Sequence, residues 1–352
     1  GGEIGKVGKC KTTQGFRFSH DTILIIRIER KTQQIPSRNL GTSLKDQRDF
    51  ASRYQCIGHI LRQIILLFHM KHDEKMNNKC PWCGSNKAQI NLWLKDEFLT
   101  KKDFHICECL NCGLLYTMPR PSKEKIGAYY KSDEYYSHQE NKKGFVPRLY
   151  EAIKKINLKH KFRLASRDLP VGKLLDIGCG VGDFLHVAEN KGWQCTGVEP
   201  SEEAREIARQ RIKGDLLYSE DLEQLPDQSF DLITMWHVLE HVDDLKWQVA
   251  QLQRLIKPNG RIVIAVPNYR SYDGRFYNAY WAAYDVPRHL NHFNKTVITK
   301  IFKTSGLSLV SMDKLIWDAY YISFMSEQYK HHFMPLVRGV FRGLVSNAKA
   351  RR

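Results

Sequence analysis

Closely spaced glycines and nearby acids form the most informative pattern in this chain. The apolar run 174–177 leads into the turn Gly178-Cys179-Gly180-Val181-Gly182. Glu199 ends a second apolar run, and its two carboxylate oxygens can accept hydrogen bonds from both hydroxyls of a ribose. In an open α/β sheet, a strand followed by a glycine turn, a helix and then an acid binds a nucleoside. We therefore expect a nucleoside ligand at this turn.

The spacing of the glycines indicates which nucleoside is bound. A dinucleotide site has the spacing G-x-G-x-x-G, whereas these glycines are spaced G-x-G-x-G and Asp183 stands at the third fingerprint position. A carboxylate at that position would repel a pyrophosphate and tolerate an ammonium group, and Asp176 adds a second acid. The pattern favours a cationic ligand. Taken alone, the turn is equally typical of a tight connection between a strand and a helix.

Further stretches follow in a fixed order and carry a family resemblance. They are Val198-Glu199-Pro200, Asp221-Leu222, Phe230-Asp231-Leu232-Ile233, and Pro258-Asn259-Gly260 before Arg261-Ile262-Val263-Ile264-Ala265-Val266. In this order the chain resembles a class I S-adenosylmethionine (SAM) methyltransferase of the small-molecule type 11/23-like group, roughly from Lys154 to Trp317. The resemblance implies an α/β fold with a doubly wound, seven-stranded, Rossmann-like sheet. The cofactor-binding residues that it implies are Asp176, Gly178, Gly180, Gly182, Glu199, Asp221, Leu222 and Trp236.

A histidine motif follows the apolar run 230–235. His237-Val238-Leu239-Glu240-His241 matches the H-x-x-E-H signature of some zinc peptidases. That signature needs a further acidic ligand downstream, and the only later glutamate is Glu327. The same pentapeptide resembles small-molecule methyltransferases, where His237 would lie beside the reacting methyl group and take a proton from an oxygen acceptor. The alternative for both histidines is a capping or packing role.

The connection 268–294 carries a second set of polar residues. It resembles the family segment W-x-x-x-D-x-P-R-H-L-x-x-F, which packs over the acceptor pocket. The resemblance implies His289 as a second catalytic residue and Tyr284, Asp285 and Arg288 as substrate-binding residues for a polar or anionic acceptor. Asp285 and Arg288 have a plainer alternative, which is to pair with each other and fix the loop.

Two C-x-x-C-G pairs predict a metal site. They consist of Cys80 and Cys83, then Cys109 and Cys112, with a hairpin expected between them. Four thiolates in two pairs suit tetrahedral Zn²⁺, and a site closed by four ligands is structural. Disulfides are the alternative, but we find no secretory signal pattern, so we expect zinc and a cytoplasmic location. In some sugar-modifying methyltransferases a similar zinc ribbon precedes the SAM domain.

The charge of the chain lies at its two ends. The formal net charge is +17, of which residues 1–79 carry +8 and residues 328–352 carry +6. Only +3 remains for the segment that holds every motif. An enzyme acting on nucleic acid should carry its basic patch on the working domain, so we expect no nucleic-acid partner.

These features divide the chain into five parts. Residues 1–69 are expected to be an upstream extension or a disordered segment, with a helix at Ile57–Met70 as the alternative. They are followed by a zinc ribbon at 70–118, an aromatic and helical linker at 119–170, the methyltransferase domain at 171–323 with its insertion at 268–294, and a basic tail at 324–352. The tail alternates apolar and basic residues, which fits a helix on a membrane surface or an ordinary docked tail.

The expected function is SAM-dependent methylation of a small hydroxylated acceptor, on oxygen. The resemblance points to a sugar or a polysaccharide precursor as that acceptor. The alternatives are a SAM-fold binding protein without catalysis, or a methyltransferase acting on nucleic acid or protein. The sequence leaves the acceptor's identity and the oligomeric state open.

Overall fold

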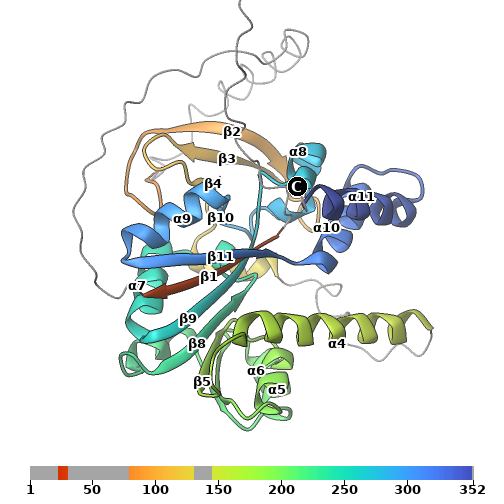
Figure 1. Ribbon diagram of the computed structural model, residues 1–352. Helices are drawn as coiled ribbons and strands as arrows, with labels where there is room; N and C mark the ends of the chain where they lie inside the picture. Colours follow the sequence, from red (N-terminus) through yellow and green to blue (C-terminus); the bar gives the residue numbers. More distant parts are fainter. Residues whose placement is uncertain (1–22, 31–78, 131–144, 351–352) are drawn as a thin grey trace, which may run out of the picture.

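A seven-stranded sheet crosses the middle of the molecule (Figure 1). The computed structural model describes residues 23–30, 79–130 and 145–350. The strands follow the order β11-β1-β9-β8-β5-β6-β7. Their bounds are Ile23–Arg30 for β1, Lys173–Ile177 for β5, Gln194–Val198 for β6, Asp215–Leu217 for β7, Phe230–Trp236 for β8, Ile256–Pro267 for β9 and Leu307–Lys314 for β11. Strands β5 to β9 are parallel to one another, which confirms the predicted α/β sheet.

Strand β1 is the largest departure from the sequence-based prediction. It belongs to the segment expected to be an extension or disordered, yet it lies inside the sheet and runs antiparallel to both β9 and β11. Its buried side chains alternate between the two faces, with Leu24, Ile26 and Ile28 on one and Ile23 and Ile25 on the other. The physical reason is that an apolar run too short to form a core alone gains two partner strands from the far end of the chain. The rest of residues 1–69, including the helix considered at 57–70, lies outside the described residues.

Helices cover both faces of the large sheet. Side chains of α4 (Phe145–Ser166), α5 (Asp183–Glu189) and α10 (Ile316–Tyr329) share one apolar core with the sheet. Side chains of α7 (Leu245–Leu255) and α9 (Lys295–Thr304) share the other core. The helix predicted in the linker is therefore α4, and it packs on the methyltransferase sheet.

Short polar residues begin several of these helices. The Asp244 carboxylate accepts a hydrogen bond from the backbone of α7, and the Asn294 side chain does the same for α9. Ser201 caps α6 (Glu202–Arg209), which has two glutamates in its first turn. Such caps satisfy amide groups that have no partner within the helix, and acids in the first turn complement the helix dipole. They fix where each helix leaves the carboxyl edge of the sheet.

A smaller sheet joins the cysteine-rich region to the insertion. Its strand order is β10-β4-β3-β2. The bounds are Ala88–Lys95 for β2, Asp103–Cys109 for β3, Leu115–Met118 for β4 and Asn291–His292 for β10. Strands β2 and β3 form the predicted hairpin, and β10 comes from the insertion 268–294. The ribbon and the insertion therefore form one structural unit.

Short helices complete this unit and the edge of the large sheet. In the ribbon and insertion they are α2 (Lys123–Ile126), η2 (Gly127–Tyr129), α8 (Tyr272–Tyr277), η5 (Asn278–Tyr280) and η6 (Ala282–Tyr284). At the edge of the large sheet they are η3 (Ser219–Gln224) and η4 (Leu239–His241). Both of the latter follow the carboxyl ends of parallel strands, where open α/β sheets bind their ligands.

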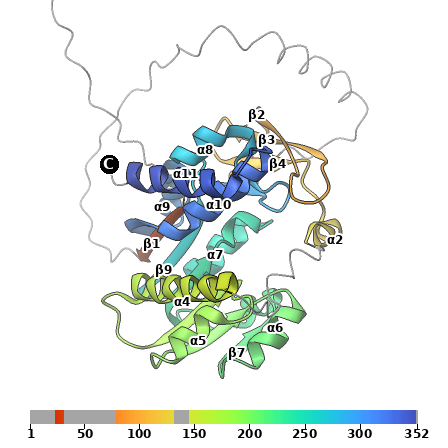
Figure 2. The same ribbon diagram turned by 90° about the vertical axis from the view of Figure 1, so that its right-hand side faces the viewer.

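The chain ends in two helices that pack on each other. Strand β11 ends at Lys314 and α10 begins at Ile316, so the tail predicted at 324–352 starts inside a helix. It is followed by α11 (Pro335–Lys349). Figure 2 shows α4, α10 and α11 on the same side of the molecule. Among the described helices, none is long and apolar enough to cross a membrane.

Candidate active site

The glycine turn forms the floor of the site. It connects β5 to α5, and Gly178, Gly180 and Gly182 all have positive φ angles, of 73°, 54° and 78°. A Cβ atom at Gly178 would lie 2.4 Å from a methyl group of Val238, so a larger residue cannot occupy this position. A Cβ atom at Gly180 would meet nothing within 4 Å. The turn therefore packs tightly against Val238, which follows β8, whereas the space next to Gly180 is empty.

The carboxylate of Glu199 closes the turn from the next strand. One oxygen accepts a hydrogen bond from the amide of Gly180 at 2.9 Å, and the other accepts one from the amide of Ser201 at 3.0 Å. Glu199 follows β6 directly, so its carboxylate lies at the carboxyl edge of the sheet, where the ribose acid was predicted. A carboxylate has further lone pairs for the hydroxyls of a ribose.

Asp176 is a buried acid at the end of β5. Its side chain is 2% exposed, and one oxygen accepts a hydrogen bond from the Thr234 hydroxyl at 2.6 Å. Burial raises the pKa of Asp176 to about 7, although Thr234 and the charge of Lys161 act in the opposite direction. The group therefore changes charge near neutral pH and would favour a cation when ionised.

Asp183 has a different role from the one its position predicts. Its carboxylate forms ion pairs with Lys154 of α4 at 2.7 Å and with Arg211 at 2.8 Å. Two cations thus neutralise the negative charge that was expected to repel a pyrophosphate and to receive an ammonium group. The expectation is corrected because both partners come from segments that the motif does not include.

The predicted cofactor-binding residues Asp221 and Leu222 stand after β7. The Asp221 carboxylate accepts a hydrogen bond from the Tyr218 amide at 2.9 Å and so caps η3, while the Leu222 side chain is buried. Across the site, Trp236 ends β8 with its ring 5.3 Å from that of Phe184. The indole nitrogen of Trp236 is buried and has no hydrogen-bond partner. An unpaired donor, an open glycine turn and acids at the strand ends together fit a nucleoside with a cationic portion.

His237 stands between two carboxylates. Its Nε2 atom lies 2.8 Å from Asp318 of α10, and its Nδ1 atom lies 3.7 Å from Glu240. Burial disfavours the imidazolium, but the two acids outweigh this effect and raise the pKa of His237 to about 9. The side chain is 30% exposed and immediately precedes Val238, which contacts the glycine turn. It is therefore an accessible, strongly basic imidazole at the predicted place.

The other members of the histidine cluster are more deeply enclosed. Both oxygens of Glu240 are buried without a hydrogen-bond partner. Potential ligand atoms of Glu240, His241 and His289 lie within 4.8 Å of one another, an arrangement with room for a cation. His241 contacts Tyr130 and the carbonyl of Arg288, and burial lowers its pKa to about 4. The H-x-x-E-H motif itself is split, because His237 points to Asp318 and His241 points into this cluster.

His289, predicted to be catalytic, lies in the wall of the site. Its Nδ1 atom is 2.9 Å from the carbonyl oxygen of Ala283, and its ring packs edge-on against His241 with centroids 4.6 Å apart. The residue is 9% exposed. It is placed to hold the shape of the insertion and to contact His241.

The predicted substrate-binding pair is engaged within the protein. The Arg288 guanidinium donates to Asp285, to the carbonyl of Tyr129 and, at 3.0 Å, to Asp96, which is completely buried. It also lies over the ring of Phe98. Arg288 thus ties the insertion to the ribbon. The observed contacts agree with the plainer alternative, in which Arg288 pairs with Asp285 and fixes the loop.

Tyr284 is likewise part of the core of the insertion. It is 7% exposed, and its ring packs edge-on against Trp281 and His292. Burial raises the pKa of Tyr284 above its ordinary value. The structure therefore buries Tyr284 and Arg288, whereas Asp285 is partly exposed and pairs with Arg288.

The four predicted cysteine ligands come together. Sulfur atoms of Cys80 and Cys112 lie 3.5 Å apart, as do those of Cys83 and Cys109, and all four ligand atoms are within 4.8 Å of one another. These distances are too long for a disulfide, whose sulfurs are about 2.05 Å apart. They approach the edge of about 3.8 Å of a tetrahedron with Zn–S bonds of about 2.3 Å. Cys107 lies outside the cluster, so the geometry fits a metal held by the predicted set.

The sequence analysis missed Asp318 and Lys161. Asp318 stands in α10, and Lys161 lies 5.0 Å from the Trp236 ring on the inner face of α4. The helical period of α4 could have identified Lys161 as facing inward, because it falls on the same face as Leu158, Phe162 and Leu164. No local signal identifies Asp318, because its partner His237 is 81 positions away.

Comparisons with known proteins agree with this geometry. The family model described as "Methyltransferase domain" matches residues 149–312. A ubiquinone biosynthesis O-methyltransferase of Pelagibacter ubique is 30% identical over 172 residues, which are 45% of this chain and 72% of the relative. The demethylmenaquinone methyltransferase of Thermotoga maritima is 28% identical over 49% of this chain and 77% of its own length. The alignment covers 42% of another ubiquinone biosynthesis O-methyltransferase, from Idiomarina loihiensis.

A solved structure is similar over a comparable part of the chain. The magnesium protoporphyrin IX methyltransferase of Synechocystis PCC 6803, with bound SAH, is 18% identical over 54% of this chain and 91% of that chain, with a TM-score of 0.41. Together, the sheet, the glycine turn and the acids at the strand ends define a nucleoside-binding α/β protein. By the sequence relationships above, the chain belongs to the SAM-dependent methyltransferases.

Proposed function

We propose that the protein transfers a methyl group from SAM to an oxygen of a small hydroxylated acceptor. The cofactor supplies an electrophilic methyl group when it is bound. The residues that would hold it are Asp176, Gly178, Gly180, Gly182, Glu199, Asp221, Leu222 and Trp236. The observation that carries the proposal is the His237 imidazole, accessible beside the glycine turn and held by two carboxylates.

The environment of His237 supports a role as the base. An imidazole with a pKa of about 9 is a stronger base than an ordinary histidine, whose pKa is about 6.5. The neutral imidazole that can accept a proton is the main form only above about pH 9; a phenolic hydroxyl has a pKa of about 10, so a proton can pass from it to neutral His237 at little cost in free energy. Asp318, on the far nitrogen, orients the ring and stabilises the imidazolium that results.

The acceptor that we favour is a phenolic, quinone-type molecule. The names of two relatives of which the chain covers more than two thirds refer to ubiquinone biosynthesis and to demethylmenaquinone. The sequence analysis expected a sugar or a polysaccharide precursor, gripped by Asp285 and Arg288. In the structure these two side chains bind each other, which leaves the sugar without its expected contacts.

Replacing His237 with glutamine tests this function. We expect kcat for methylation of a catechol to fall about 100-fold or more, since general-base catalysis contributes roughly that much. SAM binding, measured by calorimetry, should stay within about twofold of the parent, because the variant removes no predicted cofactor contact. Product is measured as methylated catechol by mass spectrometry, with a nucleotide sugar assayed in parallel.

The matched control is His186→Gln, on the exposed surface of α5. A parent protein that binds SAM and methylates no hydroxylated acceptor would support the alternative without catalysis.

The variant Asp318→Asn tests whether Asp318 positions His237 and sets its pKa. Loss of the carboxylate should lower the pKa of His237 and move the rise of kcat/KM with pH to lower pH, which a merely structural role would not do.

The affinity for SAM should depend on the ionisation of Asp176. Burial raises the pKa of Asp176 to about 7, so the carboxyl is mainly neutral at about pH 6 and mainly ionised at about pH 8. The sulfonium is attracted only to the ionised form. The Kd for SAM should therefore fall about tenfold between these two pH values. Calorimetric titration at a series of pH values measures the change.

Two controls isolate the charge. The Asp176→Asn variant should bind SAM with little dependence on pH, because its side chain cannot ionise. S-adenosylhomocysteine lacks the sulfonium charge and should show a weaker dependence with the parent protein. An affinity for SAM that is constant from about pH 6 to 8 in the parent would contradict the role of Asp176.

We further propose that Cys80, Cys83, Cys109 and Cys112 hold a structural Zn²⁺ ion. The spacing of their sulfurs supports four-thiolate coordination, and the glycine after each pair adopts a positive φ that turns the chain around the ligands. A hydrogen bond from Cys112 is the largest effect on Cys80 and lowers its pKa to about 5, so a thiolate is available. A site closed by four thiolates leaves no position for a reacting water.

A further inference from the structure

Helix α11 is packed with its small residues inward. A Cβ atom at Gly339 would lie 2.6 Å from the Cα atom of Phe324, and one at Gly343 would lie 2.5 Å from the ring of Tyr320. Only glycine allows this close approach of α11 to α10. Gly339 and Gly343 therefore form the surface through which α11 packs on α10.

The opposite face of α11 is apolar and exposed to solvent. We call this face the apolar stripe, and its side chains are 47–63% exposed. It consists of Leu336, Val337, Val340, Phe341 and Leu344. The spacing of three and four residues places all of them on one side of a helix. A surface helix normally buries such a stripe, so this one is arranged for contact with something outside the described residues.

The sequence around the apolar stripe is basic. Residues 328–352 contain six lysines and arginines and no aspartate or glutamate. Arg338 is held in place by Glu327, and Arg342 and Lys349 lie over aromatic rings of α8. The stripe is thus flanked by positive charges in defined positions.

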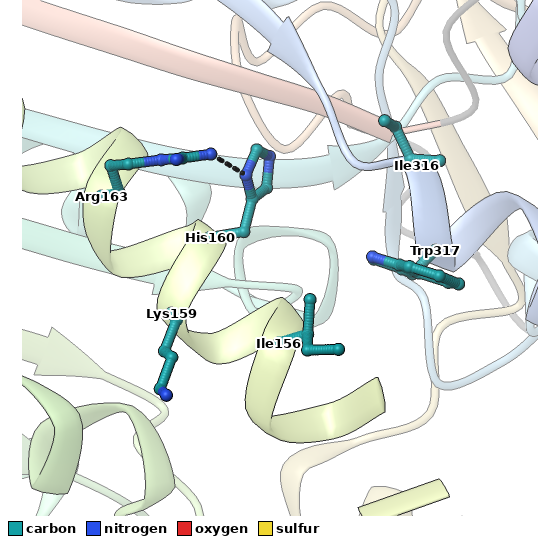
Figure 3. Close-up of a pocket in the computed structure, with 6 residues that line it drawn as sticks. All are labelled: Ile156, Lys159, His160, Arg163, Ile316 and Trp317. Carbon is teal, nitrogen blue, oxygen red and sulfur yellow. Dashed lines mark hydrogen bonds between the residues drawn. The ribbon is translucent and has the colours of Figure 1, made fainter. Parts of the chain in front are cut away.

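A basic cavity lies on the same side of the molecule, between α4 and α10. It has a volume of about 360 Å³. Figure 3 shows Ile156 of α4 on one side and Ile316 and Trp317 of α10 on the other, with Lys159, His160 and Arg163 on α4 beside them. Residues 153–166 of α4 contain five lysines and arginines and no acid. Lys154 is paired with Asp183 and Lys161 faces the Trp236 ring, so Lys159 and Arg163 are the α4 cations that line the cavity.

We propose that the apolar stripe of α11 docks onto the surface of an anionic lipid bilayer. Apolar side chains would enter the boundary between headgroups and acyl chains, while the flanking lysines and arginines bind acidic headgroups. A second copy of the chain is disfavoured as the occupant, because two identical stripes would bring their cations together. The N-terminal residues 1–79 are disfavoured for the same reason, since they carry a net charge of +8.

Sedimentation with vesicles tests the proposal on the full chain. The protein should sediment with vesicles of phosphatidylcholine mixed with phosphatidylglycerol, and only weakly with phosphatidylcholine alone. The double variant Phe341→Ser, Leu344→Ser should lower the partition onto the mixed vesicles about tenfold or more, because two large apolar side chains no longer enter the lipid. Both side chains are exposed, so the fold and the affinity for SAM should be retained.

Leu110→Ser is the matched control. Leu110 is 59% exposed, as is Phe341, but it lies in the second cysteine pair, and its replacement should leave vesicle binding unchanged. Equal binding to neutral and anionic vesicles would overturn the proposal, as would no binding to either. A dimer seen by light scattering and abolished by the double variant would assign the apolar stripe to a second copy instead. Vesicle binding requires no methyl transfer. Failure of this proposal would therefore leave the proposed function unaffected, and failure of the proposed function would leave this proposal unaffected.

Discussion

A chain with aspartate in place of Ile25 should fail to reach the native state at 37 °C. Ile25 is completely buried in the middle of β1, between β9 and β11. The five apolar side chains that β1 buries contribute roughly 10 kcal/mol together, which is comparable to the whole stability of a typical domain. A carboxylate at this position would cost several kcal/mol more, whether it is buried charged or is protonated. Circular dichroism with urea unfolding measures the loss.

Two comparisons make this result specific to the strand. Ile25→Val keeps the apolar contact and should cost only about 1 kcal/mol. A chain that starts at Met70 lacks β1 and would leave the paired edges of β9 and β11 open, so it should aggregate or bind SAM weakly. Cooperative unfolding of Ile25→Asp at the same urea concentration as the parent would show that β1 is dispensable.

The central part of the fold could be predicted from local patterns. Each parallel strand is an apolar run, and the glycine turn marks the passage from β5 to α5. Strand β1 gave no such signal. Its run of four apolar residues is too short to form a core alone, and its partners at Ile264 and Met312 lie more than 200 positions away in the sequence. Pairing over such a distance depends on the open position between β9 and β11 in the sheet.

The candidate site likewise contains residues whose positions local patterns could predict and residues whose contacts they could not. Glu199 and Asp176 lie at strand ends, where the topology fixes the direction of the chain, and the structure places them beside the glycine turn as expected. Asp183 and Arg288 were misjudged because their partners come from other elements. Lys154 on α4 and Asp96 on the ribbon neutralise them, and neither neighbour is visible from a motif.

The ribbon is connected to the site through the insertion. Strand β10 of the insertion pairs with β4 of the ribbon, and Arg288 joins Asp96 of the ribbon to Asp285. The insertion also holds His289 against His241, four positions after His237 along the chain. If the acceptor binds beside His237 as proposed, the cysteine cluster would stabilise the wall of the acceptor site, whereas the predicted cofactor residues are carried by the large sheet.

Replacing Cys109 with serine should consequently abolish metal binding and methyl transfer while leaving SAM binding nearly intact. Structural zinc sites contribute roughly 10–16 kcal/mol of binding free energy in zinc-finger peptides, so we expect a loss of at least about 5 kcal/mol in the stability of the ribbon. Zinc content by atomic absorption, thermal unfolding, and the Kd for SAM measure the three effects. A chelator added to the parent protein should reproduce all of them.

Cys107→Ser provides the control within the same strand. Cys107 is buried but lies outside the cluster, so its replacement should retain the zinc and cost only about 1 kcal/mol. If Cys109→Ser kept one zinc per chain and the thermal transition of the parent, the four-thiolate site would be wrong. If it lost zinc and methyl transfer continued at the parental rate, the coupling of the ribbon to the acceptor wall would be wrong. These two outcomes test separately whether the four thiolates hold the ribbon together and whether the ribbon supports the wall of the acceptor site.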